Sequence, residues 1–454
     1  MALMPLADQM FLLPESREQP MHVGSLQLFT PPPGSGPDYL TELYFDALRA
    51  TDIAKPFRQR PHRSIGTFGQ WTWVEDTELD LEHHIRHSAL PPPGRVRELL
   101  ALVSRLHSTL LDRHRPLWEA HLIEGLADGR FAVYTKLHHA LMDGVSGLRL
   151  LERTLSSDPD SREVRMPFEE RPRTPRPKSG GGLLSLPLQA GQAAWDLATL
   201  TPRVLRLAEQ GLRDSGVVLP LQAPRSVLKV PITGSRRFAA QAWPMDRIKA
   251  VGKAADATVN DVVLAMCASA LRTYLLELDA LPDAPLVAMT PVSLREEDDD
   301  ADGGNAVGTI LCNLATDVED AEERLLAIRT SMRAAKGALR GLNQLQVTAL
   351  SAAVMGPLTL GLAPSLQSAV RPPYNLVISN VPGPKEPLYW NGARLEGMYP
   401  LSIPTNGQAL NITVTSYAGS MEFGLIGDRR SLPHLQRMLP ALDQGLADLE
   451  KAFL

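Results

Sequence analysis

Two adjacent histidines, His138 and His139, precede Asp143 and Gly144 in the segment FAVYTKLHHALMDGVSGLRLL. A neutral imidazole titrates near neutral pH and can take the proton of a hydroxyl group while the hydroxyl oxygen attacks an electrophile. Gly144 would let the main chain turn tightly beside the pair. The pattern therefore predicts a site for general base catalysis.

Spacing alone leaves two other interpretations open. A histidine at the end of a strand can be a hydrogen-bonded core residue, and His138, His139 and Asp143 could together bind a metal ion. No cysteine or further histidine lies close in sequence to complete a metal shell, and we expect no metal. The only cysteines are Cys267 and Cys312, which excludes a disulfide scaffold and a cysteine-rich zinc module and fits a reducing cytoplasm.

The elements around this segment predict an α/β protein. The apolar run Phe131–Lys136 predicts a strand that ends just before the histidine pair, and His22–Phe29 predicts another strand. Apolar residues at helical spacing predict a helix over Arg97–Leu110. Strands that alternate with helices favour layers of sheet and helix.

The second half of the chain shows the same mixture of patterns. A long helix over Asn260–Leu278 has Thr258 and Asn260 as capping candidates at its start. Further predicted elements are strands over Pro285–Val292 and Tyr374–Ser379, a hairpin of Leu410–Tyr417 and Ser420–Gly427 that turns at Ala418-Gly419, and a final amphipathic helix over Pro433–Phe453.

Length and composition predict two domains. The chain has 454 residues, of which 44% are hydrophobic and 21% charged, so it has ample material for buried cores. The stretch Ser156–Gly182 combines five prolines with glycines and mixed charge, which is typical of a linker. We predict an N-terminal domain over residues 1–155, a linker with short helices over 156–225, and a C-terminal domain over 226–454.

Charge and hydropathy limit the partners and the location. With 46 basic and 51 acidic residues the formal charge is -5, so no global field attracts nucleic acid. The first residues lack the pattern of a signal peptide, and we expect a cytoplasmic protein. The segment Gly341–Val370 has no charged residue, but prolines and polar residues interrupt it too often for a membrane span. It is a candidate for a buried helical hairpin, a tunnel lining or a membrane-docking surface.

Several segments together resemble a known family. HHALMDG resembles the HHxxxDG motif of the chloramphenicol acetyltransferase-like superfamily of CoA-dependent acyltransferases, and the chain resembles the bacterial wax ester synthase/diacylglycerol acyltransferase family over nearly its whole length. The other segments that support this resemblance, in the expected order, are Pro20–Gly24, Pro116-Leu117-Trp118, Asn260-Asp261, Pro291–Arg295 and Ile378–Pro384.

The resemblance implies an α/β fold of two similar domains, each a mixed sheet flanked by helices, with an active-site tunnel at their interface. It implies that His139 is the general base for a long-chain alcohol or a diacylglycerol, whose hydroxyl attacks the thioester of a fatty acyl-CoA. Acyl-CoA is then a substrate and no cofactor is needed. His138 would be a positioning residue.

The resemblance also implies supporting roles for other residues. Asp143 would pair with Arg295 and point away from the substrate, holding the loop with Gly144 that aims the base. Asn260 is either an ordinary helix N-cap or a polar group that orients the thioester or its oxyanion.

Pro116, Leu117 and Trp118 have two readings that the sequence does not separate. They either pack in the core near the motif strand or shape a channel for the acyl chain.

Two other functions compete with this prediction. A related HHxxxDG enzyme could use other alcohols or, as a condensation domain, carrier-bound acyl groups, although we find no carrier module within these residues. A non-catalytic lipid-binding protein of the same fold is disfavoured by the intact HHALMDG segment. Because the expected substrates partition into membranes, we also expect peripheral association with the inner membrane or with lipid droplets.

Overall fold

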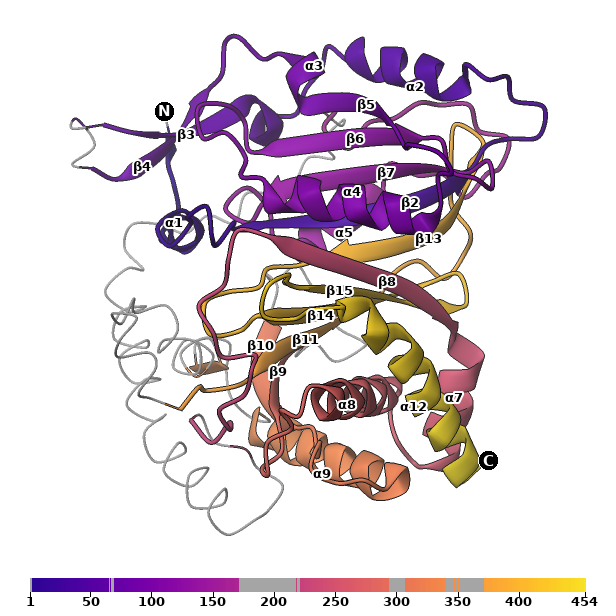
Figure 1. Ribbon diagram of the computed structural model, residues 1–454. Coiled ribbons are helices and arrows are strands. Elements are labelled where there is room, and N and C mark those ends of the chain that lie inside the picture. Colours follow the sequence, from indigo (N-terminus) through magenta and orange to yellow (C-terminus); the bar gives the residue numbers. More distant parts are fainter. Residues whose placement is uncertain are drawn as a thin grey trace, which may run out of the picture.

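The computed structural model of the chain describes residues 2–64, 66, 69–170, 218, 221–293, 307–339, 346–347, 350 and 371–454. Within this part, two six-stranded mixed sheets lie one above the other, and a smaller three-stranded sheet stands at one side (Figure 1). The candidate Arg295 lies outside the described residues, as do the predicted linking helices and most of Gly341–Val370.

The N-terminal sheet has the strand order β12-β13-β2-β7-β6-β5. Strands β5 and β6 run parallel, and the other neighbours run antiparallel. Its strands are β2 (His22–Thr30), β5 (Ile85–Ala89), β6 (Trp118–Glu124), β7 (Phe131–His138), β12 (Tyr389–Trp390) and β13 (Ala393–Leu401). The helices of this half are α2 (Tyr39–Leu48), α3 (Leu81–His84), α4 (Val96–Ser108) and α5 (Gly144–Glu152).

One strand of this sheet comes from the far end of the chain. Strand β13 pairs with β2 from Arg394 opposite Thr30 to Leu401 opposite Gly24. The predicted division into residues 1–155 and 226–454 therefore does not separate the two sheets, because Tyr389–Leu401 completes the first one. A local pattern cannot reveal such a crossover, since the pairing partner lies more than 350 residues away.

The C-terminal sheet has the strand order β10-β9-β11-β14-β15-β8, with β11 parallel to both of its neighbours. Its strands are β8 (Arg236–Pro244), β9 (Val287–Ser293), β10 (Val307–Asn313), β11 (Leu376–Val381), β14 (Leu410–Tyr417) and β15 (Ser420–Asp428). The helices that lie below it in Figure 1 are α7 (Met245–Ala254), α8 (Val259–Glu277), α9 (Ala321–Leu339) and α12 (Met438–Phe453).

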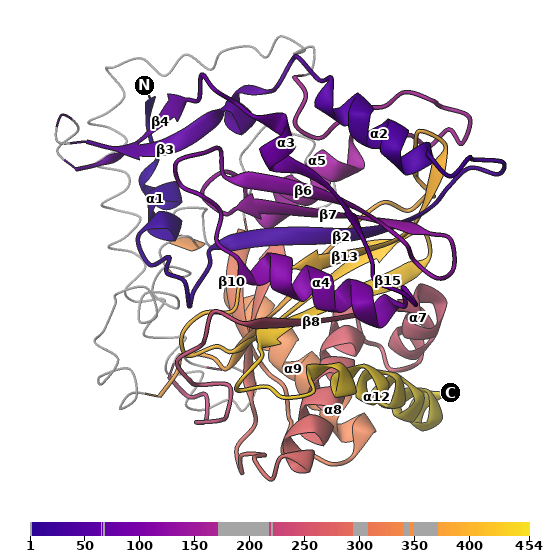
Figure 2. The ribbon, with the colours of Figure 1, turned by 45° about the horizontal axis from the view of Figure 1, so that its top comes forward.

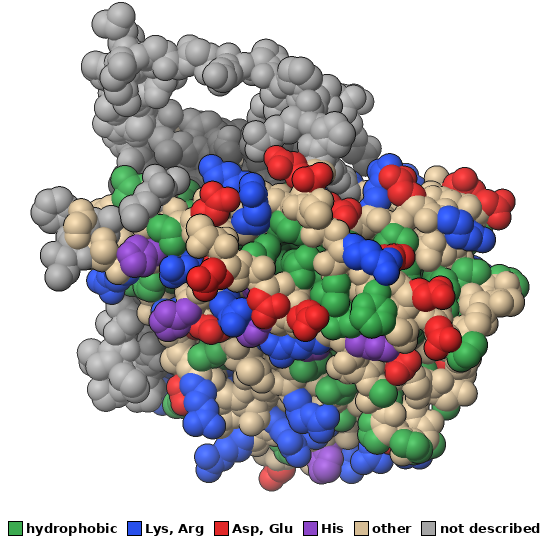
Figure 3. Space-filling view, turned by 90° about the horizontal axis from the view of Figure 1, so that it is seen from above, with side chains coloured by type: hydrophobic (Ala, Val, Ile, Leu, Met, Phe, Trp, Pro, Cys, Tyr) green, Lys and Arg blue, Asp and Glu red, His purple; other side chains and the backbone are tan. Residues whose placement is uncertain are grey.

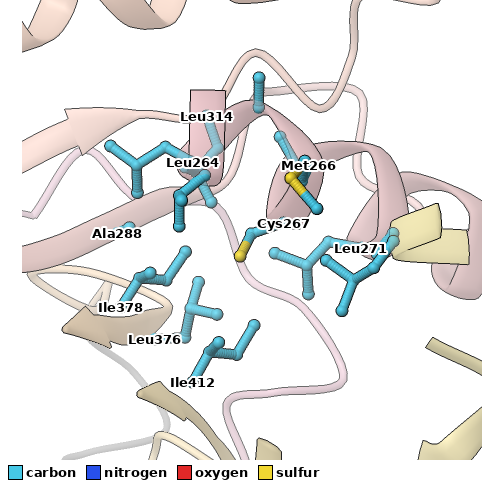
Figure 4. Packing of buried hydrophobic residues seen from close by; sticks show 14 of the residues in the cluster. Leu264, Met266, Cys267, Leu271, Ala288, Leu314, Leu376, Ile378 and Ile412 are labelled. Atoms are coloured by element: carbon cyan, nitrogen blue, oxygen red, sulfur yellow. The ribbon is translucent and has the colours of Figure 1, made fainter. Parts of the chain in front are cut away.

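The larger core lies between this sheet and helix α8. Figure 4 shows Cys267 and Leu271 of α8 beside the strand residues Ala288, Leu376 and Ile412, all of them fully buried. Helix α8 is also the one described helix with the length and hydropathy of a membrane span, but 72% of its most apolar window is buried inside the protein. Its hydrophobicity on all sides is explained by this central position.

Helix α4 joins the two halves. It lies along strand β8 at the boundary between the sheets (Figure 1, Figure 2). The hydroxyls of Ser104 and Ser108 accept hydrogen bonds from the main-chain N–H groups of Phe238 and Arg236, at 3.0 and 2.8 Å. The edge of β8 that has no partner strand is thus covered by polar side chains of α4, a helix from the other half.

The N-terminal residues form part of the third sheet. Strand β1 (Ala2–Leu3) pairs with β4 (Trp71–Glu75), which pairs with β3 (Gln59–Arg63). Helix α1 (Leu6–Leu12) follows β1 and buries Leu12 with Met4 and Leu117 in a small cluster of its own. The start of the chain is thereby held against the N-terminal half.

Most of the predicted elements are found within a few residues of their expected bounds. The predicted hairpin turns at Ala418 and Gly419, whose φ angles of 41° and 89° are the left-handed values that two-residue hairpin turns require. The predicted fold class, two mixed sheets flanked by helices, is confirmed.

The surface over the N-terminal half shows charges of both signs. In Figure 3, acidic and basic side chains are interspersed across the middle and upper part of this face around a central hydrophobic area, and the lower rim shows mainly Lys and Arg side chains. No extended field of one sign dominates this face of the described residues. Acidic and basic residues, which are nearly equal in number over the whole chain, are thus both present on this face.

Candidate active site

A cavity of about 450 Å³ lies between the two sheets and contains His139 in its wall. Strands β2 and β7 and helix α5 line it from the N-terminal half, and β11 and β14 line it from the C-terminal half. Strand β13 contributes Pro400 and Leu401 at the seam between the two halves. We call this space the interface cavity.

His139 follows directly after strand β7 and is held by two contacts. Its main-chain N–H donates to the carbonyl oxygen of Met21, just before β2, at 2.8 Å. Its imidazole stacks on the ring of Phe11 in α1, with 3.9 Å between ring centroids and 21° between ring planes. Imidazole Nδ1 is buried and has no hydrogen-bond partner among the described residues, which leaves Nε2 as the nitrogen available to the interface cavity.

The surroundings of His139 keep it neutral. Burial lowers the pKa of its imidazole to about 4, although the charge of Asp143 and the main-chain carbonyl of His139 itself act in the opposite sense. A base with this pKa is unprotonated at neutral pH, so it is ready to accept a proton.

His138 differs because one of its ring nitrogens accepts a hydrogen bond and the other lies at ion-pair distance from a carboxylate. The main-chain N–H of Ala140 donates to Nδ1 at 3.0 Å, and Nε2 lies 3.2 Å from Oε1 of Glu15. An Nδ1 that accepts a hydrogen bond carries no proton, which assigns the proton to Nε2, on the side of Glu15. His138 is fully buried and is not among the residues that line the interface cavity.

The carboxylate of Glu15 is itself fixed by two further donors. The guanidinium of Arg113 donates to Oε2 at 2.9 and 2.7 Å, and the main-chain N–H of Met21 donates to Oε1 at 3.1 Å. Burial raises the pKa of Glu15, but the interactions with His138 and Arg113 outweigh this effect and lower it. The carboxylate is therefore charged at neutral pH.

Asp143 begins helix α5 and lies in the wall of the interface cavity. Its carboxylate caps the helix, accepting hydrogen bonds from the main-chain N–H of Ser146 at 2.7 Å and from the Ser146 hydroxyl at 3.1 Å. The residue is exposed and lines the interface cavity, so the expectation that it points away from the substrate is wrong. Its expected partner Arg295 lies outside the described residues.

Gly144 is the first residue of α5 and is exposed. A Cβ at this position would meet no atom within 4 Å, and its φ is not in the left-handed region. The predicted need for glycine in a tight turn is therefore not seen, because helix α5 starts here with ordinary backbone geometry.

Asn260 is the second residue of helix α8 and does not lie in the wall of the interface cavity. The N-cap of α8 is Thr258, which exchanges hydrogen bonds with Asp261, so the reading of Asn260 as the cap is wrong. Oδ1 of Asn260 instead accepts a hydrogen bond from Nδ2 of Asn380 at 3.3 Å. Because Ser379 and Val381 line the interface cavity, strand alternation places Asn380 on the opposite face of β11.

Pro116, Leu117 and Trp118 are buried at the start of β6. Leu117 packs in the small cluster under α1. Trp118 stacks on His84 at 4.5 Å and on Phe168 at 4.8 Å, and its indole N–H donates to the carbonyl of Phe57 at 3.0 Å.

Trp118 also lines a second, smaller cavity of about 50 Å³, which we call the apolar cavity. Trp118 thus packs in the core and also lines a cavity. The two cavities share Thr135, Leu137 and Leu151 in their walls, so they are neighbours on the same face of the sheet.

The sequence did not point to three residues of this site. Phe11 and Glu15 come from an N-terminal segment whose pattern marks no chemistry, and they reach the histidines only through the fold. Ser25 lines the interface cavity, and its buried hydroxyl has no hydrogen-bond partner among the described residues. Strand β2 also contains His22 and Gln27, so the polarity of Ser25 gave no distinct signal in the sequence.

The histidine pair and Asp143 do not form a metal site. Among the described residues, no group of three or more His, Cys, Asp or Glu side chains is arranged to hold a metal ion. The nitrogens of His138 are engaged by Ala140 and Glu15 in any case.

The chain is similar to proteins of one family over its whole length. The family model for the wax ester synthase/diacylglycerol acyltransferase catalytic domain matches residues 3–263, and the model for the C-terminal domain of the same family matches residues 303–450. The probable diacylglycerol O-acyltransferase tgs2 of Mycobacterium tuberculosis is 54% identical over 455 residues, which cover 100% of this chain and 99% of that protein. A putative diacylglycerol O-acyltransferase of Mycobacterium bovis is 44% identical over 95% of this chain and 87% of its own length.

Solved structures agree with this assignment. The wax ester synthase/diacylglycerol acyltransferase from Marinobacter aquaeolei VT8 is 47% identical and superimposes with a TM-score of 0.80 over 100% of this chain and 99% of that one. The first condensation domain of the CDA synthetase shares the fold alone, with 17% identity and a TM-score of 0.56 over 100% of this chain and 97% of its own. The chain therefore belongs to the wax ester synthase/diacylglycerol acyltransferase family of acyl-CoA-dependent O-acyltransferases.

Proposed function

We propose that this acyltransferase moves a fatty acyl group from acyl-CoA to the free hydroxyl of a diacylglycerol, with His139 as the general base. The observation that carries the proposal is the neutral, half-buried imidazole of His139 in the wall of a cavity between two sheets. The names of the mycobacterial relatives favour diacylglycerol over a long-chain alcohol as the main acceptor.

The reaction follows from the state of the imidazole. His139 Nε2 takes the proton of the acceptor hydroxyl while the hydroxyl oxygen forms a bond to the thioester carbonyl carbon. The resulting tetrahedral oxyanion collapses, the carbon–sulfur bond breaks, and the imidazolium returns the proton to the CoA thiolate. Ester and free CoA thiol are the products, and no covalent acyl-enzyme is formed.

His138 acts through its neighbours in this proposal. Its Nδ1 lone pair is used by the Ala140 N–H, and its Nε2 proton lies on the side of Glu15. It has no free lone pair with which to accept a proton, which makes it a positioning residue.

The apolar cavity is the proposed site for the end of a hydrocarbon chain. Strands β2 and β7 pair Val23 with Leu137, Ser25 with Thr135 and Gln27 with Val133, and these pairs run from the interface cavity to the apolar cavity. Side chains two residues apart on a strand share a face, so the two strands provide a continuous floor. Trp118 lies beyond this floor in the wall of the apolar cavity, which fits the expected role of the Pro116–Trp118 segment in shaping a channel.

We further propose that the enzyme works at a phospholipid membrane on the cytoplasmic side. Three apolar side chains on β1, α1 and the residue after it are exposed, Leu3 by 67%, Met10 by 42% and Leu13 by 59%. Met10 and Leu13 lie within two residues of Phe11 in sequence, and Phe11 contacts the proposed base, so a lipid surface here would bring a membrane-dissolved acceptor close to the site. The segment Gly341–Val370, the other docking candidate, lies mostly outside the described residues.

Substitution of the base tests the reaction. We expect His139→Ala to reduce release of CoA from palmitoyl-CoA and dioleoylglycerol by about 10²–10⁴-fold, the usual worth of general base assistance, with an unchanged thermal unfolding temperature. His138→Asn should retain more activity. A folded His139→Ala protein with wild-type turnover would overturn the proposal, and a preference for hexadecanol over dioleoylglycerol would make the chain a wax ester synthase instead.

The membrane proposal has its own test. Met10→Asp and Leu13→Asp should each reduce co-sedimentation with phosphatidylcholine vesicles, while turnover of a short-chain, detergent-dispersed acceptor stays near the wild-type value. Val96→Asp, at an exposed apolar residue of α4, is the matched control. Equal vesicle binding by all these variants would contradict docking through α1.

A further inference from the structure

The two histidines of the motif are both contacted by one short segment at the start of the chain. Phe11, in α1, stacks on the imidazole of His139. Glu15, three residues after α1, lies 3.2 Å from His138 Nε2 and has only 2% of its side chain exposed. These two residues, which we call the N-terminal clamp, are more than 120 positions away from the histidines in sequence.

The contacts of Glu15 extend to the main chain of His139. Oε1 of Glu15 accepts a hydrogen bond from the Met21 N–H, and the Met21 carbonyl accepts one from the His139 N–H. Arg113 closes the arrangement, since its guanidinium donates both to Glu15 Oε2 and to the carbonyl oxygen of Leu12 at the end of α1. One buried carboxylate thereby ties α1 and the start of β2 to both histidines.

The contact of Phe11 acts on the imidazole ring itself. A ring stacked at 3.9 Å covers one face of His139 and excludes water from it. Nδ1 of His139 makes no hydrogen bond to another described residue, and the one main-chain group that acts on the imidazole through a hydrogen bond is the carbonyl of His139 itself. Stacking on Phe11 is the one ring contact recorded for this imidazole in the described structure.

We propose that Phe11 and Glu15 are positioning residues for the acyl transfer: Phe11 orients and desolvates the His139 imidazole, and Glu15 fixes His138 and the backbone that carries His139. The proposal rests on the proposed function of His139 as the base. The burial that lowers the pKa of His139 to about 4 is then in part the work of the Phe11 ring. Loss of that ring would admit water and let the pKa rise toward its ordinary value of 6.5.

Other charged groups around the His139 imidazole also shift its pKa, so they bear on the pH dependence of the reaction. The charge of Asp143 raises the pKa of His139, and a charge on His138 lowers it. The acidic residues of the N-terminal segment are Asp8, Glu15 and the exposed Glu18, and Glu15 has a lowered pKa. All of these charged groups are still present in Phe11→Ala, so a shift in the pH profile of that variant is caused by the loss of the aromatic ring.

The first experiment measures kcat and KM for acyl-CoA release against pH in full-length wild type, Phe11→Ala and Phe11→Tyr. A base must be neutral, so kcat/KM falls as the pH drops through its pKa, near pH 4 in the wild type. In Phe11→Ala we expect this limb to move toward pH 6.5, leaving about a tenth of the neutral-pH value at pH 5.5. Phe11→Tyr keeps an aromatic ring and should restore the wild-type profile.

At pH 8 the imidazole of His139 is neutral in every variant, so a change in kcat at this pH depends on the position of the ring and not on its protonation. Here Phe11→Ala should lower kcat by about 10- to 100-fold through misplacement of the imidazole, with KM for acyl-CoA nearly unchanged. Val96→Ala, which shortens an exposed apolar side chain of α4, is the matched control and should behave as the wild type. A histidine NMR titration of each protein measures the pKa of His139 without reference to activity.

Glu15→Gln tests the second half of the clamp. The amide keeps the size of the carboxylate but loses its charge toward Arg113 and His138, so kcat should fall by about tenfold or more while KM changes little. Glu18→Gln, at an exposed residue of the same segment, is the control. Should Glu15→Gln prove too unstable to purify, Arg113→Lys removes the paired guanidinium geometry and should lower kcat in the same direction.

The outcomes separate the clamp from the proposed function. If His139→Ala is inactive but Phe11→Ala keeps both the wild-type pH profile and the wild-type kcat, the clamp is wrong and the base assignment stands. If His139→Ala itself turns over at the wild-type rate, the proposed function of His139 as the general base is wrong. A His139 pKa that stays near 4 in Phe11→Ala would also overturn the role of the ring.

Discussion

Gly424 in β15 touches Pro400 in β13 so closely that a Cβ at Gly424 would lie 1.8 Å from the carbonyl oxygen of Pro400. Strand β15 belongs to the C-terminal sheet and β13 to the N-terminal sheet, so this is a point at which the two sheets meet. Pro400 and its neighbour Leu401 also line the interface cavity. The missing side chain at Gly424 therefore sets the separation of the sheets next to the proposed base.

Gly424→Ala is expected to force the sheets apart. Overpacking at such a contact costs typically about 1–3 kcal/mol of unfolding free energy, and the displaced Pro400 would reshape the cavity and lower turnover. Gly337→Ala in α9 is the control, since a Cβ there meets no atom within 4 Å and helix propensity should add about 0.5–1 kcal/mol of stability. Urea unfolding and CoA release check both variants, and equal stability of the two would contradict the close contact.

Asp143→Ala is expected to act mainly through helix α5. Loss of the N-cap should lower the free energy of unfolding by about 1 kcal/mol, and turnover should fall modestly because α5 lines the interface cavity. The removed charge raises the pKa of His139, so that pKa should drop further and the base should stay neutral at pH 7. Ser146→Ala, which leaves the cap's main-chain bond intact, is the control. A loss of turnover above 10³-fold with unchanged stability would mean that Asp143 takes part in the chemistry.

Ser25→Ala is expected to change stability and activity in opposite directions. Its buried hydroxyl has no hydrogen-bond partner in the described structure, and an unsatisfied buried hydroxyl costs about 1–3 kcal/mol, so the variant should unfold at a higher temperature. Because Ser25 lines the interface cavity, turnover should fall if the hydroxyl binds the substrate.

Thr290→Val provides the comparison for Ser25. The Thr290 hydroxyl is also buried without a partner among the described residues, but Thr290 is not in the wall of the interface cavity. It should gain stability and keep wild-type turnover. If Ser25→Ala also keeps wild-type kcat and KM, the Ser25 hydroxyl has no part in binding substrate.

Thr135→Ile is expected to shorten the preferred acyl chain. Thr135 lines both the interface cavity and the apolar cavity, so a larger side chain there narrows the passage between them. Turnover of palmitoyl-CoA should fall relative to octanoyl-CoA, measured as a ratio of kcat/KM values. Val133→Ile, which lines the apolar cavity alone, should reduce turnover of long chains only. An unchanged ratio in Thr135→Ile would show that the chain takes another path.

Local patterns were sufficient for much of the fold. The apolar run that ends at the histidine pair is strand β7, and the helical spacing after Arg95 is helix α4. Thr258 and Asp261 close a capping box within four residues, and Ala418-Gly419 forms the predicted turn. Each of these features depends on residues that are neighbours in sequence, so the pattern contains the cause of the structure.

Parts of the site depended on contacts that no local pattern contains. In the sequence, Asn260 lies at the predicted start of a helix. Whether it faces the cavity depends on which face of β11 packs against α8. Asn260 contacts Asn380, which is on the face of β11 away from the cavity. Asp143 was expected to point away from the substrate, whereas its position at the exposed start of α5 places it in the wall of the interface cavity. Burial is a property of the packed molecule, which residue spacing does not specify.

The sequence by itself determined the reactive pair, the order of the family's segments and the elements that flank them, because residue type and short-range periodicity set chemistry and secondary structure. Only the tertiary structure decided that Phe11 and Glu15 meet His139 and His138, that β13 crosses to the first sheet, and that the base is desolvated. These relations join residues from about 120 to more than 350 positions apart, and they form because burying apolar faces brings distant segments together.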